Sequence, residues 1–351
     1  MIAIIAVCLV LILVFAYLMF RISRLVDNLK KTDAKQESHP EGTNTHNGLY
    51  FLIFTVAGLG AFFWYSFKYF SQYNLPLASV HGAETDYLFW ATMAITVAAF
   101  VIIFIVMFWF TYKYSYQSTR KAAYYMDNKY LEMAWTIVPA IVLTILIFGG
   151  LRTWGRITAK AAAGAEEIEL VGQQFFWTAR YPGSDKELGR HDFRMIDATN
   201  EFGLDLMDKK SFDDFKSLTL HLPKGKEVLL RIRAKDVLHS VFLPHFRVKM
   251  DAVPGMLTTF KFTPTKTTEE MRKELNKPDF NYEMACAEIC GKGHFSMRFP
   301  VVVEEPSVYE KWKSQQEAWL KQNPDYLQRV PPWLKDAAKK SAGLDSLTAK
   351  Q

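Results

Sequence analysis

Six residues in the C-terminal half of the chain carry the side chains or the spacing of a soft-metal site. Five of them stand together in the stretch C-A-E-I-C-G-K-G-H-F-S-M, and the sixth lies upstream in D-V-L-H-S; they are His239, Cys286, Glu288, Cys290, His294 and Met297. Thiols, imidazoles and a thioether suit copper far better than magnesium or calcium. The sequence therefore predicts a compact metal-binding loop that is completed by a histidine from another strand.

Three other arrangements of these side chains are chemically possible. The two cysteines could form a disulfide, or they could bind zinc together with the two histidines. A zinc site would leave Met297 without a role and usually spaces its cysteines as C-x2-C. A blue-copper site needs only one cysteine. Two coppers that share both sulfurs use the whole set, so we expect a dinuclear copper centre, with zinc or a disulfide as the alternatives.

The loop resembles the copper A loop of subunit II in the haem–copper family of cytochrome c oxidases. The stretch 236–255, D-V-L-H-S-V-F-L-P-H-F-R-V-K-M-D-A-V-P-G, is similar to the family segment that carries the first histidine. The stretch 131–139, L-E-M-A-W-T-I-V-P, resembles the start of the family's second transmembrane helix. Together the matching stretches fall within residues 88–305.

The resemblance implies a role for each residue of the loop. Cys286 and Cys290 would bridge two copper ions, while His239 and His294 would each bind one of them. Met297 would be a weak axial ligand. Glu288 would bind copper through its backbone carbonyl, and its carboxylate would reach a magnesium or manganese ion at the contact with subunit I. A surface-exposed glutamate is the alternative for that side chain.

Two acidic residues outside the loop also match family positions. Asp251, in D-A-V-P-G, is implied to pack near the haem-bearing subunit I. Glu132, just before M-A-W-T-I-V-P, is implied to lie at the mouth of a proton channel in subunit I, or else it only stabilises the first turn of a helix. Asp236 is expected either to hydrogen-bond His239 or to serve as a turn residue.

The chain departs from the family in its aromatic patch. Family members carry G-H-Q-W-Y-W, whose first Trp accepts electrons from cytochrome c, whereas residues 172–177 here are G-Q-Q-F-F-W. Phe175 takes the place of that Trp, and Phe176 or Trp177 could substitute for it. We therefore expect the donor to dock differently, as a tethered or supercomplex-bound cytochrome c. Five acidic residues are predicted to attract a basic donor: Glu201, Asp205, Asp208, Asp213 and Asp214.

Four uncharged apolar runs must anchor this site to a membrane: 2–20, 49–67, 87–112 and 133–151. Each approaches the ~20 residues that a helix needs to span a bilayer. Lys and Arg gather in 21–48 and 113–132, which places these loops in the cytoplasm. The chain after 152 then lies outside. We expect a multi-pass protein of the inner (cytoplasmic) membrane, with its first helix retained because that run lacks a basic leader.

Beyond residue 163 the sequence changes to short β-rich segments between Gly and Pro breaks. The predicted fold is therefore a transmembrane region of four helices followed by an all-β domain, which the resemblance implies is a cupredoxin-like Greek-key barrel. Residues 183–216 are predicted to be a surface excursion. An amphipathic helix should follow Pro306, and His191 and His245 are expected at the surface.

The expected organisation has five parts. They are 1–48, an extra helix with a cytoplasmic linker; 49–86, a second extra helix with an external loop; 87–157, the helix hairpin of the family; 158–305, the external copper domain; and 306–351, a helical tail.

The resemblance implies the electron-accepting subunit of a respiratory terminal oxidase. Electrons would pass from cytochrome c through copper A to subunit I, where oxygen is reduced to water with proton pumping. The expected partners are subunit I, other oxidase subunits, the haem donor and a copper-delivery factor. The alternatives are the copper A subunit of a nitric oxide reductase and a membrane-anchored copper carrier. The intact ligand set argues against a quinol-oxidising subunit. The net charge is +6, and the sequence carries no pattern of basic residues that predicts nucleic-acid binding.

Overall fold

The apolar runs fold into long helices. The computed structural model describes residues 17–18, 20–22, 24, 41–117, 120–121 and 123–344. Three helices in this part of the chain are long and apolar enough to cross a membrane: α2 (Glu41–Lys68), α4 (Gly82–Lys113) and α5 (Lys129–Ile157). The predicted membrane spans are confirmed for these three, whereas the run 2–20 lies largely outside the described residues.

The helices extend beyond the apolar runs. α2 begins at Glu41, so residues 41–48 of the expected cytoplasmic linker are helical. α5 begins after Asn128, whose side chain accepts a hydrogen bond from the backbone N–H of Leu131 at 3.2 Å. A capped, polar first turn therefore precedes the apolar segment. The short helix α3 (Phe70–Tyr73) follows α2.

The chain divides into two compact units, one of residues 1–65 and 99–126, the other of residues 66–98 and 127–351. In the first unit α2 packs on the C-terminal half of α4. Phenylalanine rings lie 5.4 to 6.2 Å apart across this pair: Phe51 on Phe108, Phe54 on Phe104 and Phe108, and Phe62 on Phe100. Near the start of α2, Gly48 lies so close to the backbone of α4 that a Cβ on it would be 3.0 Å from the Cα of Tyr112.

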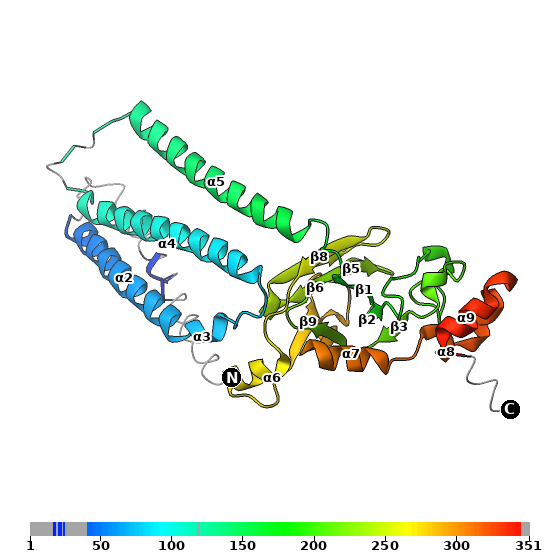
Figure 1. Ribbon diagram of the computed structural model, residues 1–351. Helices are drawn as coiled ribbons and strands as arrows, with labels where there is room; N and C mark the ends of the chain where they lie inside the picture. The colour runs from blue at the N-terminus through cyan, green and yellow to red at the C-terminus, as the bar shows by residue number, and fades with distance from the viewer. Residues whose placement is uncertain are drawn as a thin grey trace. The chain divides into compact units, whose positions relative to one another are not determined.

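In the second unit ten strands form two mixed five-stranded sheets (Figure 1). The first has the order β3-β2-β1-β5-β8, with β1 (Glu166–Gln173), β2 (Phe176–Tyr181), β3 (Phe215–Ser217), β5 (Val228–Ala234) and β8 (Thr258–Phe262). The second has the order β4-β10-β9-β6-β7, with β4 (Leu220–Pro223), β6 (His239–Leu243), β7 (Val248–Ala252), β9 (Tyr282–Cys286) and β10 (Arg298–Glu304). Two pairs are parallel, β1 with β5 and β4 with β10.

Alternate residues of the strands meet in one core between the sheets. Ile168 and Leu170 of β1 are fully buried against Ile232 of β5 and Val241 of β6. Burial of apolar side chains on one face of each strand is the pattern of a sandwich. The expected all-β, cupredoxin-like domain is confirmed.

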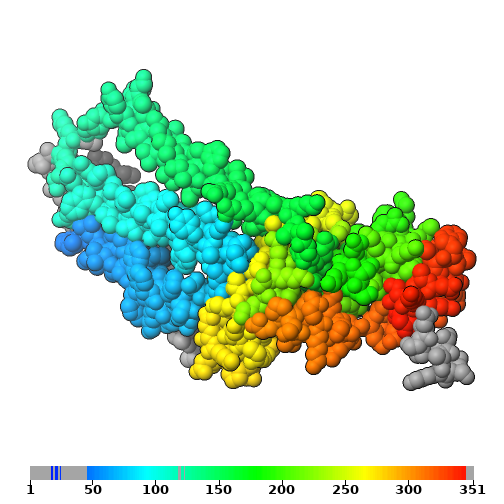
Figure 2. All heavy atoms as spheres, viewed as in Figure 1, coloured from blue at the N-terminus to red at the C-terminus, as the bar shows by residue number. Residues whose placement is uncertain are grey.

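Residues 183–216 and the C-terminal segment build a second core. Apolar side chains of both segments pack together and against Val171, which points out of the first sheet. In Figure 2 the red C-terminal helices and the green excursion form one continuous surface. Between β2 and β3 this segment therefore leaves the sheet, and its apolar side chains cover the outer face of the sheet.

Short helices complete the domain. They are α6 (Thr268–Leu275), α7 (Pro306–Ser314), α8 (Trp319–Gln322), α9 (Lys335–Ala342) and 3₁₀ turns at Phe193–Met195, Lys209–Ser211, Pro244–Phe246, His294–Ser296, Pro324–Arg329 and Pro332–Leu334. α7 is the amphipathic helix expected after Pro306.

The segment before α4 is bound along the second unit. The backbone N–H of Ala78 donates to the carbonyl of His245 at 2.8 Å, and that of Thr265 donates to the carbonyl of Ala78 at 2.9 Å. Arg247 donates to Asp86 at 2.7 Å and to the carbonyl of Leu75 at 2.7 Å. We call residues 74–86 the strap; it ties the start of α4 to the β-domain.

Candidate metal centre

Strand ends and one loop bring the predicted ligands together. His239 is the first residue of β6, and Cys286 is the last residue of β9. These strands are adjacent, with Cys286 paired to Val241. The loop that follows β9 supplies Cys290 and His294 before β10 begins. The upstream histidine therefore reaches the loop because the two strands are neighbours in one sheet.

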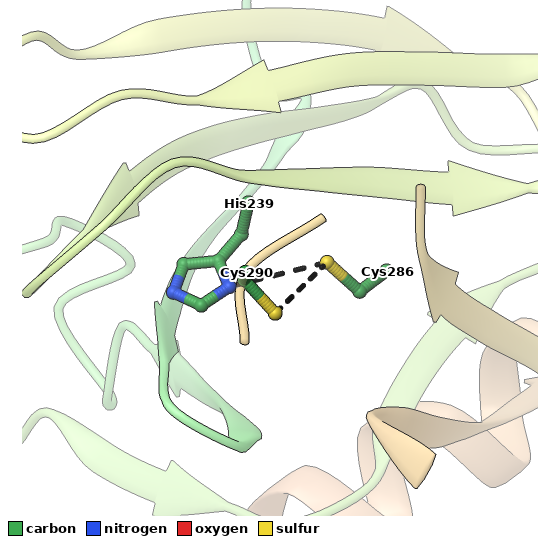
Figure 3. A group of neighbouring side chains, drawn as sticks. All are labelled: His239, Cys286 and Cys290. Carbon is green, nitrogen blue, oxygen red and sulfur yellow. Dashed lines mark hydrogen bonds between the residues drawn. The ribbon is translucent and has the colours of Figure 1, made fainter. Parts of the chain in front are cut away.

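The donor atoms converge at this end of the sheet. The Sγ atoms of Cys286 and Cys290 are 3.9 Å apart, and Cys286 Sγ is 3.9 Å from His239 Nδ1 (Figure 3). On the other side, Cys290 Sγ is 3.6 Å from His294 Nδ1 and 3.8 Å from the Sδ of Met297. The carbonyl oxygen of Glu288 lies 3.2 Å from Cys286 Sγ.

These distances bear on the alternatives. The sulfur–sulfur distance of 3.9 Å is far from the ~2.05 Å of a disulfide, and both cysteines are free. His239, Cys286 and Cys290 have donor atoms that all lie within 4.8 Å of one another. His294 falls outside this group, although it approaches Cys290. Each imidazole thus lies beside its own sulfur.

Asp236 and Gln174 form hydrogen bonds with the ligand residues His239 and Cys290. Asp236 Oδ1 lies 2.8 Å from His239 Nε2, so a proton on Nε2 leaves Nδ1 free toward Cys286. Gln174 donates its backbone N–H to Asp236 at 2.7 Å and its side-chain amide to the carbonyl of Cys290 at 2.6 Å. Burial opposes the charge of Asp236, but the hydrogen bonds from Gln174 and His239 lower its pKa overall. Sequence reasoning did not single out Gln174.

The cysteine environment disfavours free thiolates. Burial and the neighbouring Cys286 raise the pKa of Cys290 to about 11. Because thiolates bind metals, a metal that binds here must displace a proton from Cys290.

The three aromatic candidates for electron entry differ in exposure, and Phe175 lies next to the metal loop. The ring of Phe175 is half-buried beneath the metal loop, where a Cβ on Gly293 would lie 2.5 Å from its Cγ and one on Gly291 would lie 3.0 Å from its Cε1. Phe175 therefore packs under two glycines, and only part of its ring is open to a donor.

The two residues that follow have distinct positions. Phe176 is 44% exposed, whereas Trp177 is 1% exposed and contacts the ring of His239 edge-on at a centroid distance of 5.8 Å. Two further apolar side chains next to the ligands are strongly exposed, Ile289 at 85% and Phe295 at 81%. The sequence reasoning missed this pair.

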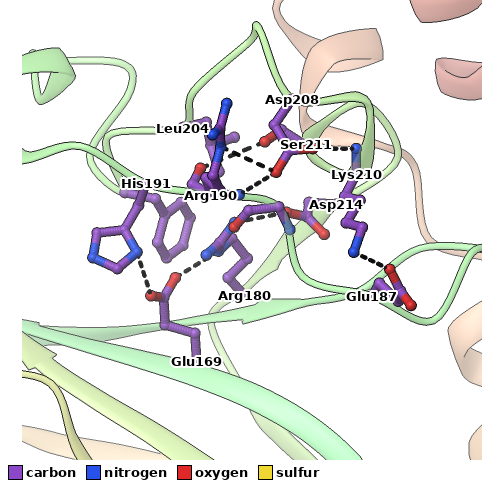
Figure 4. Close-up of polar contacts among 12 residues, drawn as sticks. Glu169, Arg180, Glu187, Arg190, His191, Leu204, Asp208, Lys210, Ser211 and Asp214 are labelled. Atoms are coloured by element: carbon purple, nitrogen blue, oxygen red, sulfur yellow. Dashed lines mark hydrogen bonds and ion pairs between the residues drawn. The ribbon is translucent and has the colours of Figure 1, made fainter.

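The predicted acidic docking surface is absent among the described residues. None of the five acidic side chains is more than 17% exposed, and each accepts a hydrogen bond or forms an ion pair within the domain. They are Glu201, Asp205, Asp208, Asp213 and Asp214. Asp214 lies 2.7 Å from Arg180, which also binds Glu169 at 2.5 Å in a buried network (Figure 4). The prediction is wrong because these carboxylates stabilise the second core.

The other predicted residues have the following places. Glu132 is exposed in the first turn of α5, and Glu288 is half-buried. Asp251 accepts a hydrogen bond from Ser240 at 2.7 Å, which lowers its pKa. His245 is not a surface residue, since its ring packs edge-on against Phe280 and Tyr282.

Two family models match the chain. Residues 69–152 match the transmembrane domain of cytochrome C oxidase subunit II, and residues 167–306 match its periplasmic domain.

Similar proteins agree with these matches. The alternative cytochrome c oxidase subunit 2 of Bradyrhizobium diazoefficiens is 33% identical over 273 residues, which are 76% of this chain and 92% of the relative. The cytochrome c oxidase subunit 2 of Thermostichus vulcanus is 32% identical over 152 residues, or 43% of this chain and 33% of the relative. The solved periplasmic domain of cytochrome oxidase subunit II from Bradyrhizobium japonicum aligns with a TM-score of 0.30 and 23% identity, covering 44% of this chain and 94% of that domain.

Proposed function

Because the chain belongs to the family of cytochrome c oxidase subunit II, we propose that its loop residues hold a dinuclear copper A centre that accepts electrons from cytochrome c. As subunit II of a terminal oxidase, the chain combines membrane spans with a periplasmic domain and is a partner of oxidase subunit I. In the proposal, electrons leave the centre for subunit I, where oxygen is reduced to water with proton pumping.

The arrangement of donors carries the proposal of two coppers. One tetrahedral metal would draw both imidazoles and both sulfurs toward a single point. Here His239 lies beside Cys286 and His294 lies beside Cys290, with the two sulfurs between them. The thioether of Met297 and the carbonyl of Glu288 lie at the two flanks. Soft sulfur and imidazole donors fit copper.

The chain's own residues keep the centre rigid. Cys286 and Cys290, with His239 and His294, would hold the copper ions, which would supply one-electron chemistry when bound. His239 and Cys286 lie at the ends of paired strands, which limits their movement. Asp236 orients His239. Gln174 donates hydrogen bonds to both Asp236 and the Cys290 carbonyl, and so links the two. Buried Trp177 packs on His239 and excludes water from that side.

For electron acceptance we favour Phe176 and Trp177 over Phe175. Phe176 is the exposed ring of the three, and the adjacent Trp177 contacts His239. With no free acidic surface among the described candidates, the proposed donor is a cytochrome c held in a supercomplex or by a tether. Its association with this subunit should then depend little on salt.

Three further roles are proposed on the family resemblance. The Glu288 carboxylate would bind magnesium or manganese at the subunit I contact, and Asp251 would lie at that contact. Glu132, exposed at the start of α5, would open the proton path. A copper-delivery factor is proposed because periplasmic thiols oxidise readily unless they are metallated or kept reduced.

Copper counting and paramagnetic resonance on the purified full chain test the main proposal. Two coppers per chain with one unpaired electron shared between them is the expected result. Cys290→Ser should abolish the shared-electron signal, whereas Ser296→Ala, an exposed neighbour, should preserve it. One copper per chain, or zinc, would contradict the proposal. Identification of the co-purifying catalytic subunit then separates oxygen reduction from nitric oxide reduction.

A further inference from the structure

A cavity of about 430 Å³ lies between the first turns of α4 and the last turns of α5, within the second unit. The lining residues that matter here are Glu84, Tyr87, Leu88, Arg152, Thr153 and Arg156. None of them belongs to the metal centre, so the cavity needs an explanation of its own.

The cavity lies at the level where the helices leave the hydrocarbon layer. α5 is free of charged residues from Met133 to Leu151, and Arg152 follows at once. α4 is free of charged residues from Tyr87 to Tyr112. The ends of such stretches mark the headgroup region of a bilayer. Because α5 continues into the periplasmic domain, this is the periplasmic leaflet.

The charges in the cavity do not balance. Arg156 donates to the carboxylate of Glu84, and the hydroxyl of Thr153 donates to the same group at 3.4 Å. Arg152, one turn earlier on α5, has no ion-pair partner among the residues that the structure describes. One guanidinium is therefore left over in the cavity. Two arginines on the outer side also run against the usual bias of basic residues toward the cytoplasm.

The walls suit an amphipathic ligand. Below the charged groups α4 and α5 touch, since a Cβ on Gly149 would lie 3.1 Å from the Cδ2 of Leu88. Tyr87, at the rim of the cavity, is 73% exposed. Tyrosine is enriched at the membrane–water interface, which is the level proposed for the cavity. The apolar segments of α4 and α5 are exposed along their length, so acyl chains can pack against them.

We propose that this cavity binds the headgroup of an anionic phospholipid in the periplasmic leaflet, with Arg152 as the charged donor to its phosphodiester. A guanidinium binds phosphate oxygens through paired hydrogen bonds. Free phosphate offers the same oxygens, but the apolar helix surfaces next to this open cavity favour a lipid.

The test counts lipids on the purified oxidase complex that contains the full chain. The complex is placed in nanodiscs of phosphatidylcholine doped with phosphatidylglycerol, and retained phosphatidylglycerol is measured by native mass spectrometry. Arg152→Gln should retain one such lipid fewer, with affinity roughly tenfold lower or more, because a charge-assisted hydrogen bond is lost. Lys129→Gln, at the opposite end of α5, should match the wild type. Equal retention in Arg152→Gln and wild type would overturn the proposal.

Two other arms separate the competing occupants. Millimolar inorganic phosphate should leave the retained lipid in place, whereas its displacement would identify a free-anion site. Arg152→Gln should keep subunit I bound, whereas dissociation would identify a protein contact. Either contrary result rejects a lipid site. The copper signal should be the same in all these variants. A negative lipid result therefore leaves the copper proposal standing, and a negative copper result leaves the lipid proposal standing.

Discussion

Asp236 is the residue on which the orientation of His239 depends. It lies three residues before the histidine and also accepts the backbone N–H of Gln174, so one carboxylate joins two loops. The ionised state is favoured by these hydrogen bonds. An amide at this position would keep the size of the side chain but remove the charge that supports the imidazole.

We therefore expect Asp236→Asn to weaken copper binding by roughly 10- to 100-fold, the usual cost of losing a carboxylate that orients a ligating histidine. Copper affinity from competition titration, with the resonance spectrum, measures the effect. Asp279→Asn, on a loop away from the ligands, is the control. Wild-type affinity in Asp236→Asn would show that the loop alone orients His239.

At the residue scale the ligands were predictable because their identity and spacing are local. The burial of Phe175 was not, since it depends on the backbone of Gly291 and Gly293, which lie far away in the chain. Two charged residues on strands are buried for a similar reason. Glu169 and Arg180 alternate with core residues and would be expected in water, but the segment 183–216 covers them.

At the scale of elements, a buried charge network joins the first sheet to the second core. Arg180 of β2 binds Glu169 of β1 and Asp214, and it donates to the carbonyl of Gly189 at 3.0 Å. Arg233 of β5 adds a second partner for Glu169 at 2.6 Å. Removing one member of such a network leaves unpaired buried charge.

Arg180→Met should lower the free energy of unfolding by about 3–5 kcal/mol, because Asp214 loses its guanidinium partner in the interior. Urea unfolding of the purified chain, followed by tryptophan fluorescence, measures this. Arg190→Met removes a side chain that is 69% exposed and should cost no more than about 1 kcal/mol. Equal losses in the two variants would argue against a special role for the network.

The same network predicts an acid sensitivity. Burial works to raise the pKa of Glu169, but Arg180 and Arg233 overcome it and lower that pKa to about 2. A lowered carboxyl pKa adds stability above the unfolded value of 4.5, and this is lost as the pH falls toward 2.

Unfolding free energies measured from pH 6 to pH 2 should therefore fall, by roughly 2–3 kcal/mol from this residue. Burial raises the pKa of Asp214, which acts in the opposite direction, so the comparison with Glu169→Gln isolates the effect. An identical pH slope in Glu169→Gln would contradict the assignment.

The strands were predictable to the extent that they alternate in hydrophobicity. β9 ends at Cys286, so the strand and the metal motif share that residue. The second core was missed because its halves are far apart in sequence. Tyr326 and Arg329, for example, both bind Asp197.

At the scale of the whole molecule, the strap joins the start of α4 to the β-domain. Its anchor is the pair formed by Arg247 and Asp86, whose side chains are 16% and 28% exposed. Backbone hydrogen bonds of Ala78 and Val80 continue the attachment. The start of α4 is thus attached to the domain that carries the metal centre.

Asp86→Ala should loosen this attachment, so that amide hydrogens of residues 78–80 exchange roughly tenfold faster. Hydrogen exchange with mass spectrometry on the full chain measures the rate. Lys249→Ala, which removes an exposed ion pair on β7, should leave the strap unchanged. Protection that persists in Asp86→Ala would mean that the backbone bonds suffice.

The second core also imposes an order on biogenesis. Arg329 lies 132 residues beyond its partner Asp197, so the excursion emerges long before the tail that covers it. At ordinary rates of synthesis the delay is on the order of ten seconds. Until the tail has been made, the apolar side chains of residues 183–216 therefore lack the C-terminal partners that they pack against in the folded domain.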